Sequence, residues 1–169
     1  MRTTSAPSSE KSVDAREANC GTTAAEARAL GCSYEPMQRS WIPADCYFPE
    51  PSDEYHPFDD REWYSDEERT QLVNSHQMNM LRNGDDFVAY TRYFHHEHCL
   101  YAWRKMAIAV EYQRPMIDTK SADLHHTTHC AKIIAKMIVE AETHTFNNSA
   151  SFTYSPLMFQ TCVPLNWKQ

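Results

Sequence analysis

One short pattern, His-x-x-His-Cys, occurs twice in the sequence, from His95 to Cys99 and again from His126 to Cys130. In an α-helix, side chains at positions i, i+3 and i+4 lie on the same face. Each copy, which we call an HxxHC motif, therefore directs two imidazoles and one thiol in a single direction. Because imidazole and thiolate are common metal ligands, the repeated motif predicts a ligand cluster built on two helices.

The residues that follow each motif predict that both lie near the start of a helix. Apolar side chains continue at helical spacing after the motifs, at Ala102, Met106, Ala109 and Val110 and then at Ile133, Ile134, Met137 and Ala141. Pro115 ends the first helix, and Ser121 or Asp123 can cap the second. Since the connection is short, we expect an antiparallel helical hairpin with the motifs on its facing, buried stripes.

The spacing alone does not fix the ligand set. His98 and His129 complete the two motifs, and His96, Glu97 and His125 flank them. Four neutral imidazoles suit copper or zinc, and copper binds nitrogen sites more tightly than zinc does. Two additional thiolates would instead favour a closed structural zinc site. The state of the cysteines therefore decides between the two metals.

The chain has six cysteines, an even number. All are disulfide candidates: Cys20, Cys32, Cys46, Cys99, Cys130 and Cys162. The first three lie in loop-rich sequence, where disulfides replace missing core, and the segment 147–149 is an N-glycosylation sequon. Both features favour the secretory lumen, where Cys99 and Cys130 are expected in a disulfide rather than as thiolates. A bridge between these two would pin the helices beside the histidines.

Charge and composition exclude several classes of function. The formal net charge of −7 argues against nucleic acid or an anionic membrane surface as the main partner. The three glycines stand too far apart to form a phosphate-binding loop. The sequence has no signal peptide and no apolar run long enough to span a bilayer. We therefore expect either a protein that is soluble as it stands or one cut behind an N-terminal membrane anchor.

The remaining chain predicts one domain, residues 20–169, behind a flexible N-terminal segment, residues 1–19. The domain is predicted to be mainly α: the hairpin, wrapped by long irregular segments rich in proline and aromatic residues, stapled by disulfides, with a small β pair near the C-terminus. A short helix at 22–31 is bracketed by Cys20 and Cys32, which should tie down both ends. Ser65 and Glu68 form a capping-box pattern that predicts a helix to about Met80.

The paired motifs resemble those of the fungal UstYa-like (DUF3328) family, found in biosynthetic clusters for mycotoxins and ribosomal cyclic peptides. The resemblance extends over roughly residues 20–137 and includes Cys20-Gly21, Gly31-Cys32, Trp41 and Cys46. It implies copper-dependent oxidative tailoring (cyclisation, desaturation, hydroxylation or halogenation), with His95, His98, His126 and His129 as the copper ligands. It also implies a lumenal catalytic part behind a membrane anchor.

Three hypotheses follow for the function. The leading one is a copper-dependent oxidase that acts on a small-molecule or peptide natural product, as a homo-oligomer or with a related family member. The second is a cyclase or isomerase without redox chemistry, in which the histidines act as general acid and base. The third is a zinc-stabilised partner of another pathway enzyme.

Overall fold

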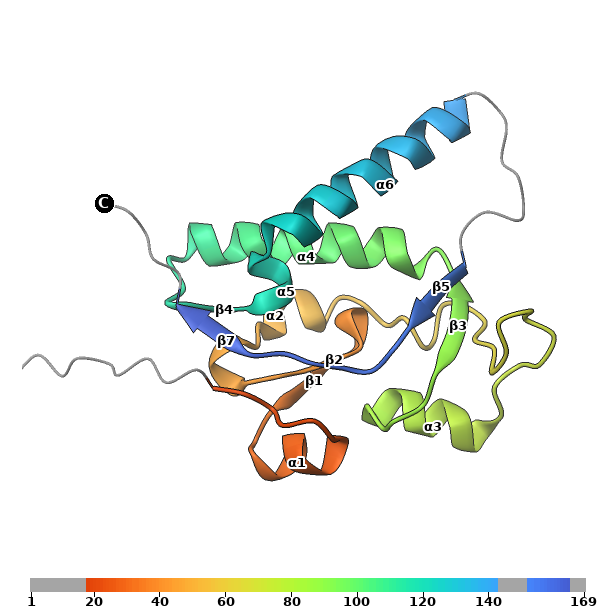
Figure 1. Ribbon diagram of the computed structural model, residues 1–169, viewed down its shortest axis with the longest axis horizontal. Helices are drawn as coiled ribbons and strands as arrows, with labels where there is room; N and C mark the ends of the chain where they lie inside the picture. The colour runs from red at the N-terminus through yellow and green to blue at the C-terminus, as the bar shows by residue number, and fades with distance from the viewer. Residues whose placement is uncertain (1–17, 143–151, 165–169) are drawn as a thin grey trace, which may run out of the picture.

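The computed structural model describes residues 18–142 and 152–164, and its secondary structure is mixed (Figure 1). Its helices are α1 (Ala24–Ala29), α2 (Pro49–Ser52), α3 (Ser75–Asn83), α4 (Phe94–Glu111), α5 (Thr119–Ala122) and α6 (Leu124–Glu142), with 3-10 turns η1 (Pro36–Gln38) and η2 (Ala44–Cys46). Its strands are β1 (Ser33–Glu35), β2 (Ser40–Ile42), β3 (Ala89–Arg92), β4 (Met116–Asp118), β5 (Phe152–Ser155), β6 (Met158–Phe159) and β7 (Cys162–Pro164). Most of the predicted flexible segment and the sequon lie outside the described residues.

The strands form three small sheets rather than the one predicted β pair. β1 pairs antiparallel with β2, which pairs in parallel with β6, while β3 pairs antiparallel with β5 and β4 with β7. The C-terminal segment 152–164 thus contributes one strand to each sheet and runs along the body beneath α4 (Figure 1). It joins parts of the chain that are far apart in sequence.

The predicted hairpin consists of α4 and α6, which are in contact. α4 ends at Glu111, four residues before Pro115, and the chain returns through β4 and α5. The Asp123 carboxylate accepts the main-chain N–H groups of His125 and His126 at 3.1 and 2.9 Å, which confirms Asp123 as the cap of α6.

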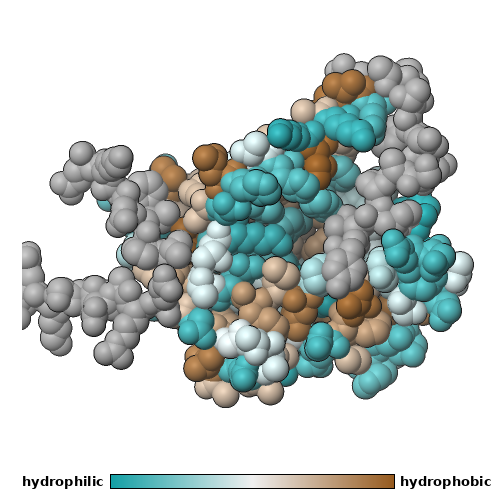
Figure 2. All heavy atoms as spheres, viewed as in Figure 1, coloured by the Kyte–Doolittle hydropathy of each residue, from teal (hydrophilic) through white to brown (hydrophobic). Residues whose placement is uncertain are grey.

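The predicted buried stripe holds on α4 at Ala102 and Ala109 but not at Val110, which is 49% exposed, and on α6 beyond Cys130 the burial of its described members is only partial. There α6 diverges from α4 and extends past its first turn (Figure 1). Ile133 and Met137 are partly buried, and Ile138 is 50% exposed. In Figure 2 hydrophobic atoms accordingly appear at the outer end of α6.

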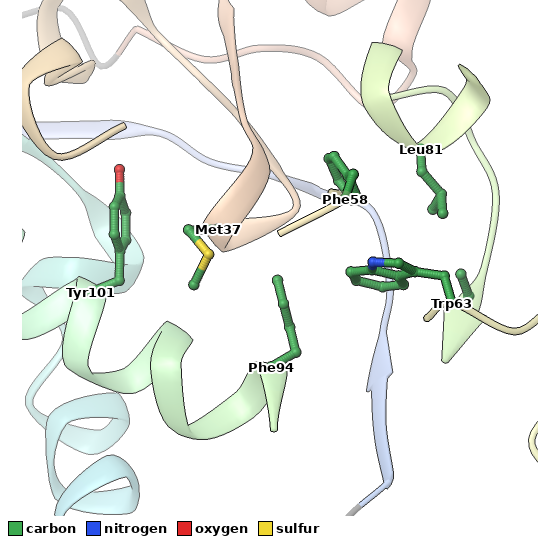
Figure 3. Packing of buried hydrophobic residues seen from close by; sticks show 7 residues of the cluster. Met37, Phe58, Trp63, Leu81, Phe94 and Tyr101 are labelled. Atoms are coloured by element: carbon green, nitrogen blue, oxygen red, sulfur yellow. The ribbon is translucent and has the colours of Figure 1, made fainter. Parts of the chain in front are cut away.

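The wrap predicted from the aromatic and proline residues is ordered and forms the main core beneath α4 (Figure 3). The cluster comprises Met37, Phe58, Trp63, Leu81, Ala89, Phe94 and Tyr101. The Trp63 indole N–H donates to the carbonyl of Pro57 at 2.7 Å, so its buried polar atom is satisfied. Tyr101 and Phe94 project into this cluster from α4, and this fixes the face of α4 that remains for the histidines.

A second buried cluster beneath α4 is charged, and no sequence pattern predicted it. Lys105 Nζ lies 2.7 Å from Asp118 Oδ2 and 3.5 Å from Glu35 Oε2, and all three side chains have no solvent exposure. Lys105 holds the pKa of Asp118 below its usual range despite burial. Burial raises the pKa of Glu35, because one lysine cannot fully compensate two carboxylates.

Three disulfides join Cys20 to Cys32, Cys46 to Cys162 and Cys99 to Cys130, so all six cysteines are paired. The first brackets α1 as predicted, with Thr23 and Glu26 forming a capping box at its start. The other two connect segments that are distant in sequence. Oxidised cysteines fit a secreted or secretory-pathway protein. Within residues 18–142 and 152–164, no helix has the length and apolar character needed to cross a membrane.

The helix predicted to begin near Ser65 is wrong. Asp66 instead accepts the main-chain N–H groups of Thr70 and Gln71 at 2.9 and 2.7 Å, which closes a loop in which Arg69 has a positive φ of 58°. α3 begins only at Ser75, after an Asn74 cap. The aspartate side chain competed with helix formation for the same N–H groups.

Candidate metal centre

The crossing of α4 and α6 brings the four motif histidines together as two pairs. His98 Nε2 lies 3.2 Å from His126 Nε2, and His95 Nε2 lies 3.3 Å from His129 Nε2. Each pair takes one imidazole from each helix, as expected for antiparallel helices that cross at the motifs. We call His98 and His126 the inner pair, because His98 is only 5% exposed, and His95 and His129 the outer pair, because His129 is exposed.

A main-chain carbonyl orients the buried ring of the inner pair. His98 Nδ1 lies 2.8 Å from the carbonyl oxygen of Met37. A carbonyl oxygen only accepts, so in the neutral ring Nδ1 carries the hydrogen and Nε2 presents a lone pair towards His126. This is how proteins orient histidines that bind metals.

The surroundings keep the imidazoles uncharged. Burial, with the nearby positive charge of Lys120, lowers the pKa of His98 well below its usual range, and it lowers the pKa of His126 in the same way. Burial and the adjacent histidines lower the pKa of His95 to about 4. These three rings are therefore neutral at pH 7, the state in which imidazole binds a metal ion.

The spacing within each pair fits two ligands of one ion. Two nitrogens that are each about 2.0 Å from an ion at a tetrahedral angle lie about 3.3 Å apart. The inner and outer pairs, at 3.2 and 3.3 Å, have this separation. The rings of His95 and His98 are farther apart, with centroids separated by 6.4 Å. The four nitrogens therefore stand as two pairs and not as one compact set.

The motif cysteines lie against the inner pair. Cys130 Sγ is 3.6 Å from His126 Nε2, and the ligand atoms of Cys99, His126 and Cys130 all lie within 4.8 Å of one another. This Cys-His-Cys cluster could hold a metal ion, for which its sulfurs would have to be thiolates. Here the two cysteines form a disulfide, which leaves nitrogen as the donor atom at this point. The site thus offers two ligand sets, selected by the redox state of one disulfide.

The flanking residues lie outside both pairs. Glu97 is bound by Arg61 at 2.6 Å, and Thr128 Oγ1 donates to the carbonyl of Leu124. His125 is exposed, and His96 is partly buried with Nδ1 lacking a hydrogen-bond partner. These side chains therefore do not orient the motif histidines; the carbonyl of Met37 does so for His98. The sequence could not have indicated this carbonyl, because any residue type supplies one.

A separate polar cavity of about 370 Å³ opens beside the first turn of α4. It is lined by Asp60, Arg61, Glu62, Tyr64, Thr91, Arg92, Tyr93 and Glu97, and none of the motif histidines contributes to it. Its lining mixes both signs of charge, with Arg61 already paired to Asp60 and Glu97. The cavity therefore adds no ligand to the candidate metal centre.

The fold and site define a disulfide-stapled domain with paired histidines at a helix crossing. The chain is 32% identical over 161 residues to phomopsin biosynthesis cluster protein B of Diaporthe leptostromiformis, a match that covers 87% of this chain and 47% of that protein. Phomopsin biosynthesis cluster protein B′ of the same organism matches equally well. The chain thus spans about half the length of the curated relatives it matches, and it is a homologue of fungal biosynthesis-cluster proteins. No family model and no solved structure gives a significant match.

Proposed function

We propose that this protein is a copper-dependent oxidative tailoring enzyme of fungal secondary-metabolite biosynthesis, of the UstYa-like type. The observation that carries the proposal is the inner pair. It places one neutral imidazole from each helix with the two Nε2 atoms 3.2 Å apart, and the carbonyl of Met37 turns the His98 Nε2 lone pair towards His126. Two nitrogen ligands of one metal ion adopt this separation, and the neutral ring is the form that binds a metal.

The donor set favours copper over zinc while the disulfide is intact. With Cys99 and Cys130 bonded to each other, the site offers only imidazole nitrogen, which copper binds more tightly than zinc does. A copper ion held by His98 and His126, or by His95 and His129, would supply one-electron oxidation of an organic substrate. The chain itself orients the His98 ring through the carbonyl of Met37.

The outer pair lies on the side from which a substrate can reach the histidines. His129 is exposed while His98 is buried, so a substrate can approach the histidines from the side of His129. Figure 2 shows hydrophilic side chains gathered over α4 and the first part of α6. A site with one buried pair of histidines and one solvent-accessible pair can exclude water on one side and admit a substrate on the other, as a binding site for a small molecule requires.

The alternatives receive unequal support. Acid–base cyclisation needs groups that titrate near the working pH, and burial holds the pKa of His95 at about 4 and that of His98 well below its usual range, so neither meets this need. A zinc-stabilised partner protein is favoured by one observation, the Cys-His-Cys cluster, and only where its disulfide is reduced. We keep it as the second candidate.

Metal analysis tests the proposal directly. Copper and zinc would be counted per chain in protein from a eukaryotic secretory host, for the wild type, His98→Ala, His129→Ala and the control His125→Ala. We expect copper in the wild type and the control, and at least a tenfold weaker affinity for copper in His98→Ala. Full copper content and full oxygen-dependent turnover in both motif variants would refute the proposal. Tight zinc with two free thiols would establish the second candidate.

We also propose a lumenal location, an N-terminal membrane anchor preceding this chain in its full-length form, and association with a second copy or a related chain. The disulfides support the first, and the resemblance described above is the basis for the other two. Protease protection in microsomes would test the location. Size-exclusion chromatography with light scattering would test the association.

A further inference from the structure

The buried charged cluster beneath α4 takes no part in the candidate metal centre. It joins Lys105 of α4, Asp118 of β4 and Glu35 of β1, whose side chains have no solvent exposure. Lys105 Nζ lies 2.7 Å from Asp118 Oδ2 and donates to Glu35 Oε2 at 3.5 Å. The buried ring of Phe48 covers the ammonium, with its centroid 5.4 Å from Nζ. An amine and two carboxyl groups therefore meet in an apolar, water-excluded part of the interior.

The cluster is unbalanced as a purely structural ion pair. One ammonium faces two carboxylates, so ion pairing leaves one buried negative charge without compensation. Within residues 18–142 and 152–164, Glu35 Oε1 has no hydrogen-bond partner. Burial also raises the pKa of Glu35, so this carboxyl group holds a proton more readily than an exposed one does. Glu35 is thus a group that can accept and return a proton beside the other two.

Lys105 and Asp118 are close enough to react with each other. A carboxylate C–O bond is about 1.2 Å long, so Nζ lies within about 3.9 Å of Asp118 Cγ. The main-chain N–H of Ser121 donates to Asp118 Oδ1 at 2.9 Å, which draws electron density from Cγ and leaves Oδ2 towards the lysine. Groups held in this way react with effective concentrations of about 10⁵–10⁸ M. Condensation of the two side chains then competes with the ion pair.

We propose that Lys105 and Asp118 condense in the folded protein to form an intramolecular amide bond, with Glu35 as the proton carrier. A proton first moves from Nζ to Oδ2, which gives the neutral amine and acid that burial favours over charged forms. Nζ then attacks Cγ, and Glu35 passes a second proton from the nitrogen to the same oxygen. Oδ2 leaves as water, so the Nζ–Cγ bond replaces the Cγ–Oδ2 bond and no oxidant or reductant is required.

The amide bond would join two parts of the fold that support the histidines. α4 carries His95 and His98, and β4 pairs with β7, which begins at the disulfide-bonded Cys162. A covalent link from α4 to β4 therefore connects the first histidine helix to the sheet in a way that reducing agents cannot break. The reaction requires neither copper nor a substrate, so its test is independent of the proposed function.

Peptide mass spectrometry of the wild-type protein tests the proposal. Trypsin does not cleave after an acylated lysine, and Arg114 is protected by the proline that follows it. The linked protein should therefore yield residues 105–120 as a single peptide that lacks one water, about 18 Da. Unlinked protein yields residues 106–120 at full mass. A cyclic imide at Asp118 also lacks one water, but it leaves Lys105 free for cleavage and yields residues 106–120 at the lower mass.

Variants assign the roles of the three residues. Lys105→Arg keeps the positive charge but cannot form the amide, so it should give no peptide that lacks water. Glu35→Gln keeps the shape of the side chain and should lower the linked fraction at least about tenfold, since a positioned proton carrier contributes about 10²–10⁴-fold in rate. The matched control Glu111→Gln, at the exposed end of α4, should leave the linked fraction unchanged.

The wild type alone can refute the inference, whether or not the variants fold. Cleavage after Lys105 with residues 106–120 at full mass, or at the mass of the cyclic imide, would overturn it. An equal linked fraction in folded Glu35→Gln and in the wild type would overturn the role of Glu35.

Discussion

Removing the disulfide beside the histidines tests both the stability of the crossing and the identity of the ligands. The change is the double variant Cys99→Ala/Cys130→Ala, which leaves no unpaired thiol to exchange with the other bridges. The two cysteines are 31 residues apart, and a cross-link of this span lowers the entropy of the unfolded chain by an amount worth about 3.7 kcal/mol at 25 °C. We expect the free energy of unfolding to fall by about that amount.

The magnitude can be checked against a bridge elsewhere in the same chain. Cys20 and Cys32 are 12 residues apart, for which the same relation gives about 2.8 kcal/mol. Guanidinium chloride unfolding of both double variants, in metal-free form at pH 7, compares the two losses directly. In thermal melts, the larger loss corresponds to a decrease of about 7 to 15 °C. A smaller loss for Cys99→Ala/Cys130→Ala than for Cys20→Ala/Cys32→Ala would refute the reasoning.

Copper binding by the same variant separates the two ligand sets. If the ligands are imidazoles, the variant keeps all four histidines and binds copper with an affinity within about tenfold of the wild type, since only their positioning is loosened. If the ligands are the thiolates of the Cys-His-Cys cluster, the metal is lost altogether. Loss of copper from a variant that remains folded would therefore contradict the imidazole assignment.

Three further predictions concern stability. Lys105→Met should lower the free energy of unfolding in urea at pH 7 by about 3 to 5 kcal/mol, because it leaves two buried carboxylates without a counter-ion. The exposed control Lys136→Met should lower it by less than about 0.5 kcal/mol, and equal losses would contradict the buried ion pairs. The metal-free protein should lose stability as the pH falls from 6.5 towards 4, because four histidines have lowered pKa values in the folded state and the unfolded chain therefore takes up protons first. Each histidine lowers the free energy of unfolding by at most about 1.4 kcal/mol per pH unit, and Glu35, whose pKa is raised, opposes the effect. A urea midpoint that rose on acidification would count against this prediction. Gly84→Ala should destabilise the protein by about 2 kcal/mol or more, since its φ is +69° and a Cβ there would lie 2.5 Å from the Tyr34 ring. Gly31→Ala has open space around it and should cost only about 1 kcal/mol. Similar melting temperatures for the two variants would exclude the clash with Tyr34.

Much of the local structure was determined by the sequence. The HxxHC motifs lie near the N-terminal ends of two helices because apolar spacing and the Asp123 cap act within a few residues. The α1 capping box is local in the same way, and its disulfide closes a span of 12 residues. Where two local signals competed, as at Asp66, the pattern predicted a helix that the structure lacks.

The site itself was decided by tertiary structure. Sequence spacing predicted that two imidazoles share a face of each helix, but not that His98 would meet His126 and His95 would meet His129, because that register depends on where the helices cross. The carbonyl of Met37 lies 61 residues from His98, and Cys162 lies 116 residues from Cys46. Such contacts come from packing the whole chain around one core, which no local pattern encodes.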